Sequence, residues 1–278
     1  MKYAYLFRIL ILTSIFLHGN TMSQQVNNTK QYVKVEMKGA IANISINEIP
    51  FIKNLETDGF ITTEPVNMWL KNGENTLSIT VYPYEESNSY SPVVSATIFV
   101  HDEKQDIPTP LKTLATIQFT PEQEDKYPTT KSIKFNIDNA ITTKLWNDAE
   151  VIKNINSQDK SQMINIADKL AEAILNNTEQ AIQLQLFKIQ DDALAEGKTV
   201  ERLTEVATKS YEWLRSQKDL KIDGIDSSKM KFNICGNNRL VNMMRDNNEE
   251  AVILESDEMY FDVGLYFAKI NGNWAIVR

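Results

Sequence analysis

The stretch Met259–Arg278, MYFDVGLYFAKINGNWAIVR, decides the fold of the second half of the chain. Its Asn-Gly pair at 271 and 272 is the pair that a two-residue type I′ turn prefers, because both central residues need a positive φ angle. The stretch therefore predicts a β-hairpin whose register the turn fixes. Counted outward from the turn, the expected cross-strand pairs are Ile270–Asn273, Lys269–Trp274, Ala268–Ala275, Phe267–Ile276, Tyr266–Val277 and Leu265–Arg278.

Alternation along these strands gives two different faces. The apolar face collects Phe261, Val263, Leu265, Phe267, Trp274 and Ile276. The mixed face carries Tyr260, Asp262, Gly264, Tyr266, Ala268, Ala275 and Val277. The apolar face needs a cover, and we expect the helical middle of the chain to supply it.

Asp262 is the one acid inside this apolar strand, and it shares the mixed face with Tyr260 and Tyr266. Burial would raise its pKa and suit it to act as an acid or as a ligand contact. The alternative is that the mixed face is the solvent side of the sheet. We take Tyr260, Asp262 and Tyr266 as the candidate ligand-binding residues.

The N-terminus has the pattern of a secretory signal peptide. Lys2 and Arg8 precede the apolar run Ile9–Leu17, and small residues follow. The alternative is an uncleaved membrane anchor, but the run is far shorter than the roughly 20 residues that span a bilayer. We expect cleavage after residue 23, export to the periplasm or the outside, and a disordered polar lead-in over 24–31.

Charge and cysteine content limit the classes of function. The chain has 37 acids and 29 bases, and acids outnumber bases on both sides of Asn139. This composition predicts no binding of nucleic acid or anionic membrane. Cys235 is the single cysteine, so no internal disulfide can form. We interpret it as a small buried residue, with an intermolecular disulfide or a reactive thiol as the alternative.

Short alternating stretches fill residues 32–138 and predict an all-β domain of sandwich type. They are Tyr32–Met37, Ala40–Ile46, Phe60–Thr62, Thr76–Val81, Val93–Val100, Leu114–Phe119 and Ser132–Ile137, with a turn predicted at Asn47–Pro50. The last two strands either complete this sandwich or open the second domain. The block Trp69–Tyr82, WLKNGENTLSITVY, resembles the final strands of immunoglobulin-like and jelly-roll modules. In this block we expect structural roles for two residues. Gly73 adopts a turn conformation that β-branched residues cannot adopt, and Asn75 hydrogen-bonds back onto the turn.

From Asn139 the hydrophobic period becomes helical. A first helix is expected over Ile141–Ile152, Ser157 is expected to cap a second, Gly197 ends a further one, and Thr199 begins the last. Strands return after Asp219 and end in the hairpin. The prediction is a two-domain protein: a β-sandwich over 32–138 and an α+β domain over 139–278. The order of elements in the second domain resembles the cystatin-like cone fold, which implies helices packed on a curved antiparallel sheet.

Motifs for catalysis are missing from the sequence. After cleavage one histidine remains, His101, which we expect to lie solvated at a strand end, so zinc sites built from several histidines are excluded. No glycine-rich phosphate loop and no Gly-x-Ser-x-Gly elbow occurs. The acidic pair Asp191-Asp192 and two similar pairs are interpreted as solvated charges. We expect no enzyme activity, cofactor or metal site.

Three functions remain as hypotheses. The first is an exported, non-catalytic module that binds a protein partner in the cell envelope. The second is a cone-shaped domain that binds a small ligand or is weakly enzymatic. The third is carbohydrate binding by the N-terminal sandwich, which requires Trp69, Tyr82 and Tyr84 to be exposed together. The identity of the partner and the oligomeric state do not follow from the sequence.

Overall fold

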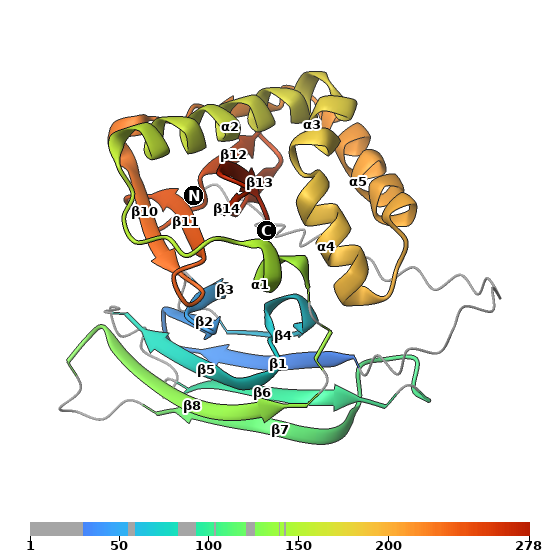
Figure 1. The fold of residues 1–278 in the computed structure, drawn as a ribbon, viewed down its shortest axis with the longest axis vertical. Helices are drawn as coiled ribbons and strands as arrows, with labels where there is room; N and C mark the ends of the chain where they lie inside the picture. The colour runs from blue at the N-terminus through green and yellow to red at the C-terminus, as the bar shows by residue number, and fades with distance from the viewer. Residues whose placement is uncertain are drawn as a thin grey trace. The chain divides into compact units, whose positions relative to one another are not determined.

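The computed structural model describes residues 30–54, 59–82, 93–102, 104–120, 126–138, 140–141 and 143–278 (Figure 1). The predicted signal peptide lies outside these residues. Within them the chain forms fifteen strands in four antiparallel sheets and five α-helices, which confirms the prediction of mixed β and α structure. Two compact units divide between Thr143 and Lys144, a few residues beyond the predicted boundary at Asn139.

The N-terminal unit, which ends at Thr143, holds two four-stranded sheets. Their strand orders are β4-β1-β6-β7 and β3-β2-β5-β8. The strands are β1 (Gln31–Lys38), β2 (Ala42–Ile46), β3 (Ile49–Asn54), β4 (Phe60–Pro65), β5 (Gly73–Val81), β6 (Val93–His101), β7 (Pro110–Phe119) and β8 (Thr129–Ile137). Because β7 pairs with β6 and β8 pairs with β5, the two strands of uncertain assignment belong to this unit.

Alternating side chains in these strands are buried and apolar, as the period-two pattern predicts. In β1, for example, Val33, Val35 and Met37 are buried. The strand β3 was not predicted, because Asn47–Pro50 was assigned to a turn. The turn is shorter: Asn47 and Glu48 alone adopt positive φ, and the chain pairs again from Ile49.

A buried asparagine pair holds the loops at one end of this unit. Asn75 donates to the carbonyls of Lys71 and Gly73, so it closes the turn as predicted. Asn47 donates to the Asn75 side chain at 2.8 Å and to the Trp69 carbonyl at 3.0 Å. Because both asparagines are buried and hydrogen-bonded, we assign them a structural role.

The C-terminal unit, Lys144–Arg278, begins with five helices. They are α1 (Lys144–Asp148), α2 (Ser157–Asn176), α3 (Thr178–Leu184), α4 (Leu186–Glu196) and α5 (Val200–Arg215). As predicted, Gly197 ends α4 in the left-handed conformation and Thr199 caps α5. The cap of α2 is Asn156 rather than Ser157, and it forms a capping box with Asp159.

The first predicted helix is much shorter than expected. It stops at Asp148 because the following backbone hydrogen-bonds to strand β14 and to the turn between β10 and β11 instead of continuing the helix. Glu150 N donates to the Lys269 carbonyl at 2.9 Å, and Ile152 N donates to the Asn238 carbonyl at 2.7 Å. These tertiary hydrogen bonds outweigh the helical periodicity, which gives a helix only over Lys144–Asp148 of the predicted range.

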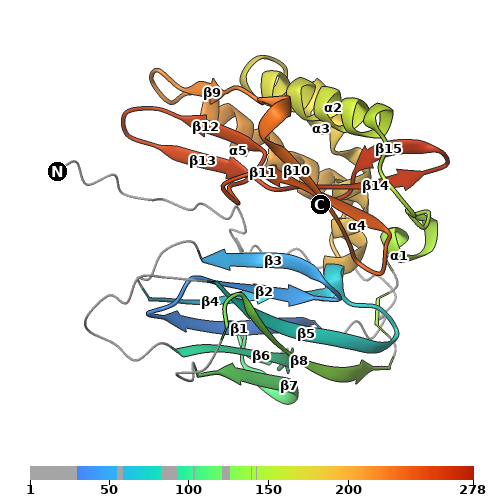
Figure 2. The same cartoon turned by 90° about the vertical axis from the view of Figure 1, so that its left-hand side faces the viewer.

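Two sheets follow the helices, with strand orders β10-β11-β14-β15 and β13-β12-β9. The strands are β9 (Lys221–Asp223), β10 (Met230–Cys235), β11 (Leu240–Arg245), β12 (Val252–Glu255), β13 (Tyr260–Val263), β14 (Leu265–Ile270) and β15 (Asn273–Ile276). The sequence predicts one continuous strand up to the turn, but the strand breaks at Gly264 between β13 and β14. Figure 2 shows the β12–β13 and β14–β15 hairpins extending in opposite directions.

The terminal hairpin has the predicted turn, with Asn271 and Gly272 both at positive φ. Its register is confirmed from Ile270–Asn273 to Phe267–Ile276. Its apolar face is buried under α2, α3 and α5 in one core cluster that includes Leu265, Phe267, Trp274 and Ile276. The helical cover expected for this face is therefore present.

The outer end of the hairpin departs from the predicted register. Val277 N and Arg278 N both donate to the Tyr266 carbonyl, while Tyr266 N donates to the Arg278 carbonyl. This is the bonding pattern of a β-bulge, in which two residues oppose one. The predicted pairs Tyr266–Val277 and Leu265–Arg278 are wrong, because the extra residue shifts Arg278 to a position opposite Tyr266.

Candidate functional site

The three predicted ligand-binding residues do not lie on one strand. Tyr260 and Asp262 belong to β13 of the three-stranded sheet, where Asp262 is half-buried opposite Ile253. Tyr266 belongs to β14 of the four-stranded sheet, beyond the break at Gly264. The structure thus separates Tyr266 from the other two and gives it different neighbours.

Tyr266 is buried on the face of its sheet that lies opposite the helices. Burial raises the pKa of its phenol well above the ordinary value, and the nearby charges of Glu250 and Cys235 raise this pKa further. The phenol therefore stays protonated at physiological pH and can donate a hydrogen bond. Gly264 admits the Glu250 carboxylate, since a Cβ at this position would lie 3.2 Å from Glu250 Oε2. A phenol, a carboxylate and a thiol gather here.

Asn242 lies directly across the strand pair from Tyr266 and adds a carboxamide to this group. The residue is 1% exposed, and its Nδ2 and Oδ1 atoms have no hydrogen-bond partner within the described part of the chain. A buried polar group in this state costs about 1–3 kcal/mol. Asn242 was not among the predicted site residues, although it is the one polar side chain in the run Leu240–Met244. We call Tyr266, Asn242, Glu250 and Cys235 the Tyr266 cluster.

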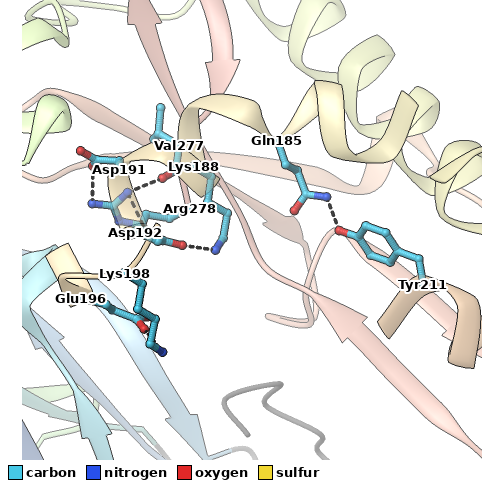
Figure 3. A network of polar contacts seen from close by, with 9 residues as sticks. All are labelled: Gln185, Lys188, Asp191, Asp192, Glu196, Lys198, Tyr211, Val277 and Arg278. Atoms are coloured by element: carbon cyan, nitrogen blue, oxygen red, sulfur yellow. Dashed lines mark hydrogen bonds and ion pairs between the residues drawn. The ribbon is translucent and has the colours of Figure 1, made fainter. Parts of the chain in front are cut away.

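Arg278 is the centre of a buried ion-pair network (Figure 3). The bulge at the end of the hairpin positions it, and its Nη2 lies 2.7 Å from Asp191 Oδ2 and its Nη1 3.4 Å from Asp192 Oδ1. Lys188 also pairs with Asp192, and Asp191 accepts from the Lys144 backbone N–H. The prediction that Asp191 and Asp192 are solvated charges is wrong, because both are buried. The network ties β15 to α4 and to the start of α1.

A surface hollow of about 530 Å³ lies between the β9–β10 connection and the end of β11. Its charged lining is largely paired within itself: Arg245 lies 2.5 Å from Asp223, and Lys229 lies 3.7 Å from Asp226. The ion pairs neutralise these four charges in place. The hollow is therefore a polar surface feature held by its own salt bridges.

The N-terminal unit has an open side formed by β7 and β8, the end strands of the two sheets, which contact each other. The ammonium of Lys131 in β8 lies 4.8 Å above the ring of Phe119 in β7. Two bulges in β7 insert Leu111 and Leu114 against β6. Leu111 is 66% exposed, and Ile107, three residues before β7, is 72% exposed. We call β7 and β8, with the exposed side chains along them, the β7–β8 edge.

Two other predicted candidates have structural surroundings. His101 is half-buried rather than solvated: its Nδ1 accepts from Thr109 N at 3.1 Å, and its ring packs edge-on against Tyr32. Trp69 is buried against Phe51, the Tyr82 hydroxyl accepts a hydrogen bond from Asn43 Nδ2 at 3.1 Å, and Tyr84 lies outside the described residues. A stacking surface for sugar that includes Trp69 is therefore not formed.

Within the described ranges, no helix has the length and apolar character needed to cross a bilayer. In the same ranges, no group of three or more His, Cys, Asp and Glu side chains is arranged to hold a metal ion. Comparison of the chain with protein-family models, with curated proteins and with solved structures finds no match.

Proposed function

We propose that the protein is an exported, non-catalytic binding module whose N-terminal unit, interpreted as a β-sandwich of immunoglobulin or jelly-roll type, engages a protein partner in the cell envelope. The expected signal peptide supports export. The C-terminal unit is interpreted as an α+β domain of cystatin-like type. The observation that carries the proposal is the pair of bulges in β7, one of which falls at the exposed Leu111, four residues after the exposed Ile107.

Bulges at a sheet edge change the direction of a side chain, and they occur often beside functional sites. A regular strand would place Leu111 in alternation with its neighbours. Here the extra residue puts an isobutyl group into solvent, where it adds nothing to the core. Contact of such exposed apolar side chains with a partner buries them and supplies binding free energy. The β7–β8 edge is therefore the surface we assign to the partner.

Leu111→Asp is expected to abolish capture of the partner when the mature chain is used as bait in an envelope extract. A charge in the centre of an interface must be desolvated, which costs more than the contact it replaces. The matched control is Ile61→Asp on the edge strand β4, where an isoleucine is 65% exposed. Quantitative mass spectrometry of the captured proteins compares the two variants with the natural chain.

The control should retain every protein that the natural chain captures. If Leu111→Asp captures the same proteins as the natural chain, the β7–β8 edge is not the binding surface. If both variants lose the same protein, the effect is general to added negative charge. Each variant is checked for folding by circular dichroism before use.

A second candidate function, binding of a small polar ligand by the C-terminal unit, is favoured by Asn242. A carboxamide buried without partners suits a molecule that offers both a hydrogen-bond donor and an acceptor. Tyr266 and Glu250 would supply further polar contacts. This candidate keeps Tyr266 from the predicted set and replaces Asp262 with Asn242 as the central residue.

Asn242→Leu is expected to raise the free energy of unfolding by about 1–3 kcal/mol, because it replaces a buried unsatisfied amide with an apolar group of similar size. Chemical unfolding of the purified protein measures the change. A stabilising substitution would mean that the natural residue is kept at a cost, as at functional sites. A loss of stability of similar size would mean that Asn242 has a structural hydrogen-bond partner, and the second candidate would then be abandoned.

A further inference from the structure

The strand β8 has an unusually regular edge for an end strand. It pairs with β5 over nine consecutive positions, from Gly73–Ile137 to Val81–Thr129, with no shift of register. By contrast, β7 is interrupted by two bulges and starts with a proline, both of which hinder pairing with another strand. Within the described residues β8 is the last strand of its sheet. Its outer backbone groups are therefore suited to accept an added strand.

The charge of this edge is opposite to that of the chain. The chain carries 37 acids against 29 bases, yet β7 and β8 together contain three lysines, Lys112, Lys131 and Lys134, and no acid. The side chain of Lys134 is 69% exposed, and its surface ion pair with Glu74 is weak in water. Like charges directly opposite each other destabilise a strand pair, so the lysines disfavour pairing of β8 with a second copy of itself.

An apolar position on the inner face of β8 is incompletely covered. Ile133 lies opposite Leu77, which is fully buried, so both belong to the inner row of the sheet. Ile133 nevertheless remains 37% exposed, whereas Phe135 in the same row is buried. Ile133 is incompletely covered because β8 is the last described strand of its sheet, with no neighbouring strand on its outer side. A further strand beside β8 would place an apolar side chain over it.

We infer that the partner contributes an extended segment of alternating apolar and acidic residues, which adds to β8 as a fifth strand of the sheet β3-β2-β5-β8. This inference rests on the proposed function, since it specifies how the β7–β8 edge binds. Main-chain hydrogen bonds give such a complex its affinity. The apolar residues of the segment cover Ile133, and its acidic residues lie on the outer face beside Lys134.

The test uses two capped ten-residue peptides with the full mature chain, one alternating valine and glutamate and one alternating valine and lysine. Hydrogen exchange followed by mass spectrometry reads the backbone amides of β8 and, as an internal reference, those of the central strand β1. The valine–glutamate peptide is expected to slow exchange in β8 and leave β1 unchanged. Lys134→Glu is expected to weaken this peptide's binding by about threefold or more, because an attractive cross-strand pair becomes repulsive.

Equal protection by both peptides, or protection of β7 without β8, would overturn the inference. Loss of β1 protection in Lys134→Glu would mean that the variant is misfolded, and Lys134→Gln then replaces it, with the same direction of effect expected. If Leu111→Asp abolishes partner capture but the valine–glutamate peptide leaves β8 unprotected, the proposed function stands and strand addition is wrong. If capture is insensitive to Leu111→Asp while the peptide protects β8, the proposed contact is wrong and strand addition stands.

Discussion

Arg278→Ala is expected to lower the free energy of unfolding by about 3–5 kcal/mol, the largest single effect predicted for this protein. The guanidinium is 2% exposed and stands between two carboxylates, of which Asp191 is 0% exposed. Removing it leaves both carboxylates buried without their counter-charge, which is far costlier than losing a surface ion pair. Urea unfolding followed by tryptophan fluorescence measures the change, since three of the four tryptophans lie in the C-terminal unit.

Lys188→Ala is the matched control, because it removes a second cation from the same network. The Lys188 side chain is 35% exposed, and Asp192 keeps Arg278 as its partner when Lys188 is absent. A loss of about 1 kcal/mol or less is expected. If Arg278→Ala and Lys188→Ala lower the free energy of unfolding equally, burial of Arg278 does not account for its contribution to stability. A partial recovery of stability in Arg278→Met combined with Asp191→Asn would support the electrostatic origin of the effect.

Asp159→Ala is expected to cost about 2–4 kcal/mol, the second largest effect, because one carboxylate serves three donors. Asp159 Oδ1 accepts from Trp274 Nε1 at 2.9 Å and lies 3.4 Å from Lys269 Nζ, while Oδ2 accepts from Asn156 N at 3.1 Å. The substitution leaves the buried indole N–H of Trp274 without an acceptor and removes the capping box of α2. The same urea unfolding measurement applies.

The pH dependence of stability gives a second readout for Asp159. Burial acts to raise the pKa of this carboxyl, but the hydrogen bonds from Trp274, Asn156 and Lys269 together outweigh burial and lower it below the ordinary value. A lowered folded-state pKa contributes stability that is complete above the unfolded value of about 4 and is lost as the pH falls through the folded value. Asp159→Asn is therefore expected to flatten the fall in stability below about pH 4.

Asp168→Asn on the same helix is the control for this pH effect. Asp168 is exposed, and partial burial followed by the charge of Glu172 raises the pKa of its carboxyl, so its ionised form is not stabilised by folding. Its substitution should change the free energy of unfolding by less than about 0.5 kcal/mol at neutral pH. If Asp168→Asn and Asp159→Asn flatten the fall in stability at acid pH equally, the hydrogen bonds to Asp159 are not the cause of that fall.

Local sequence rules account for most of the elements, because they depend on neighbours along the chain. Alternation located the strands of the N-terminal unit other than β3, and Gly197 and Thr199 located a helix end and a helix start. Errors arose where a distant backbone group competed with a local preference. The helix after Asn139 stops early because Glu150 and Ile152 hydrogen-bond to a strand and a turn that come more than 80 residues later.

The candidate surfaces were less predictable than the fold. Tyr266 was predicted from the sequence. Its cross-strand neighbour Asn242 belongs to another strand, and only the strand pairing shows that the two residues are adjacent. The exposure of Leu111 depends on the bulges in β7. Regular alternation would have placed Leu111 in the same row as the buried Ala115, Ile117 and Phe119. Asp191 and Asp192 read as surface charges because nothing in their own helix shows that an arginine 87 residues later reaches them.

By itself the sequence determined the terminal hairpin, its Asn271-Gly272 turn and its apolar face, because turn type and side-chain alternation are properties of the local backbone. Tertiary structure decided where the hairpin's strands end: at Gly264, where Glu250 occupies the space of a side chain, and at Arg278, where a bulge turns the residue towards two buried carboxylates. Both strand ends depend on residues that are distant along the chain and meet only in the folded structure, so the local sequence does not predict them.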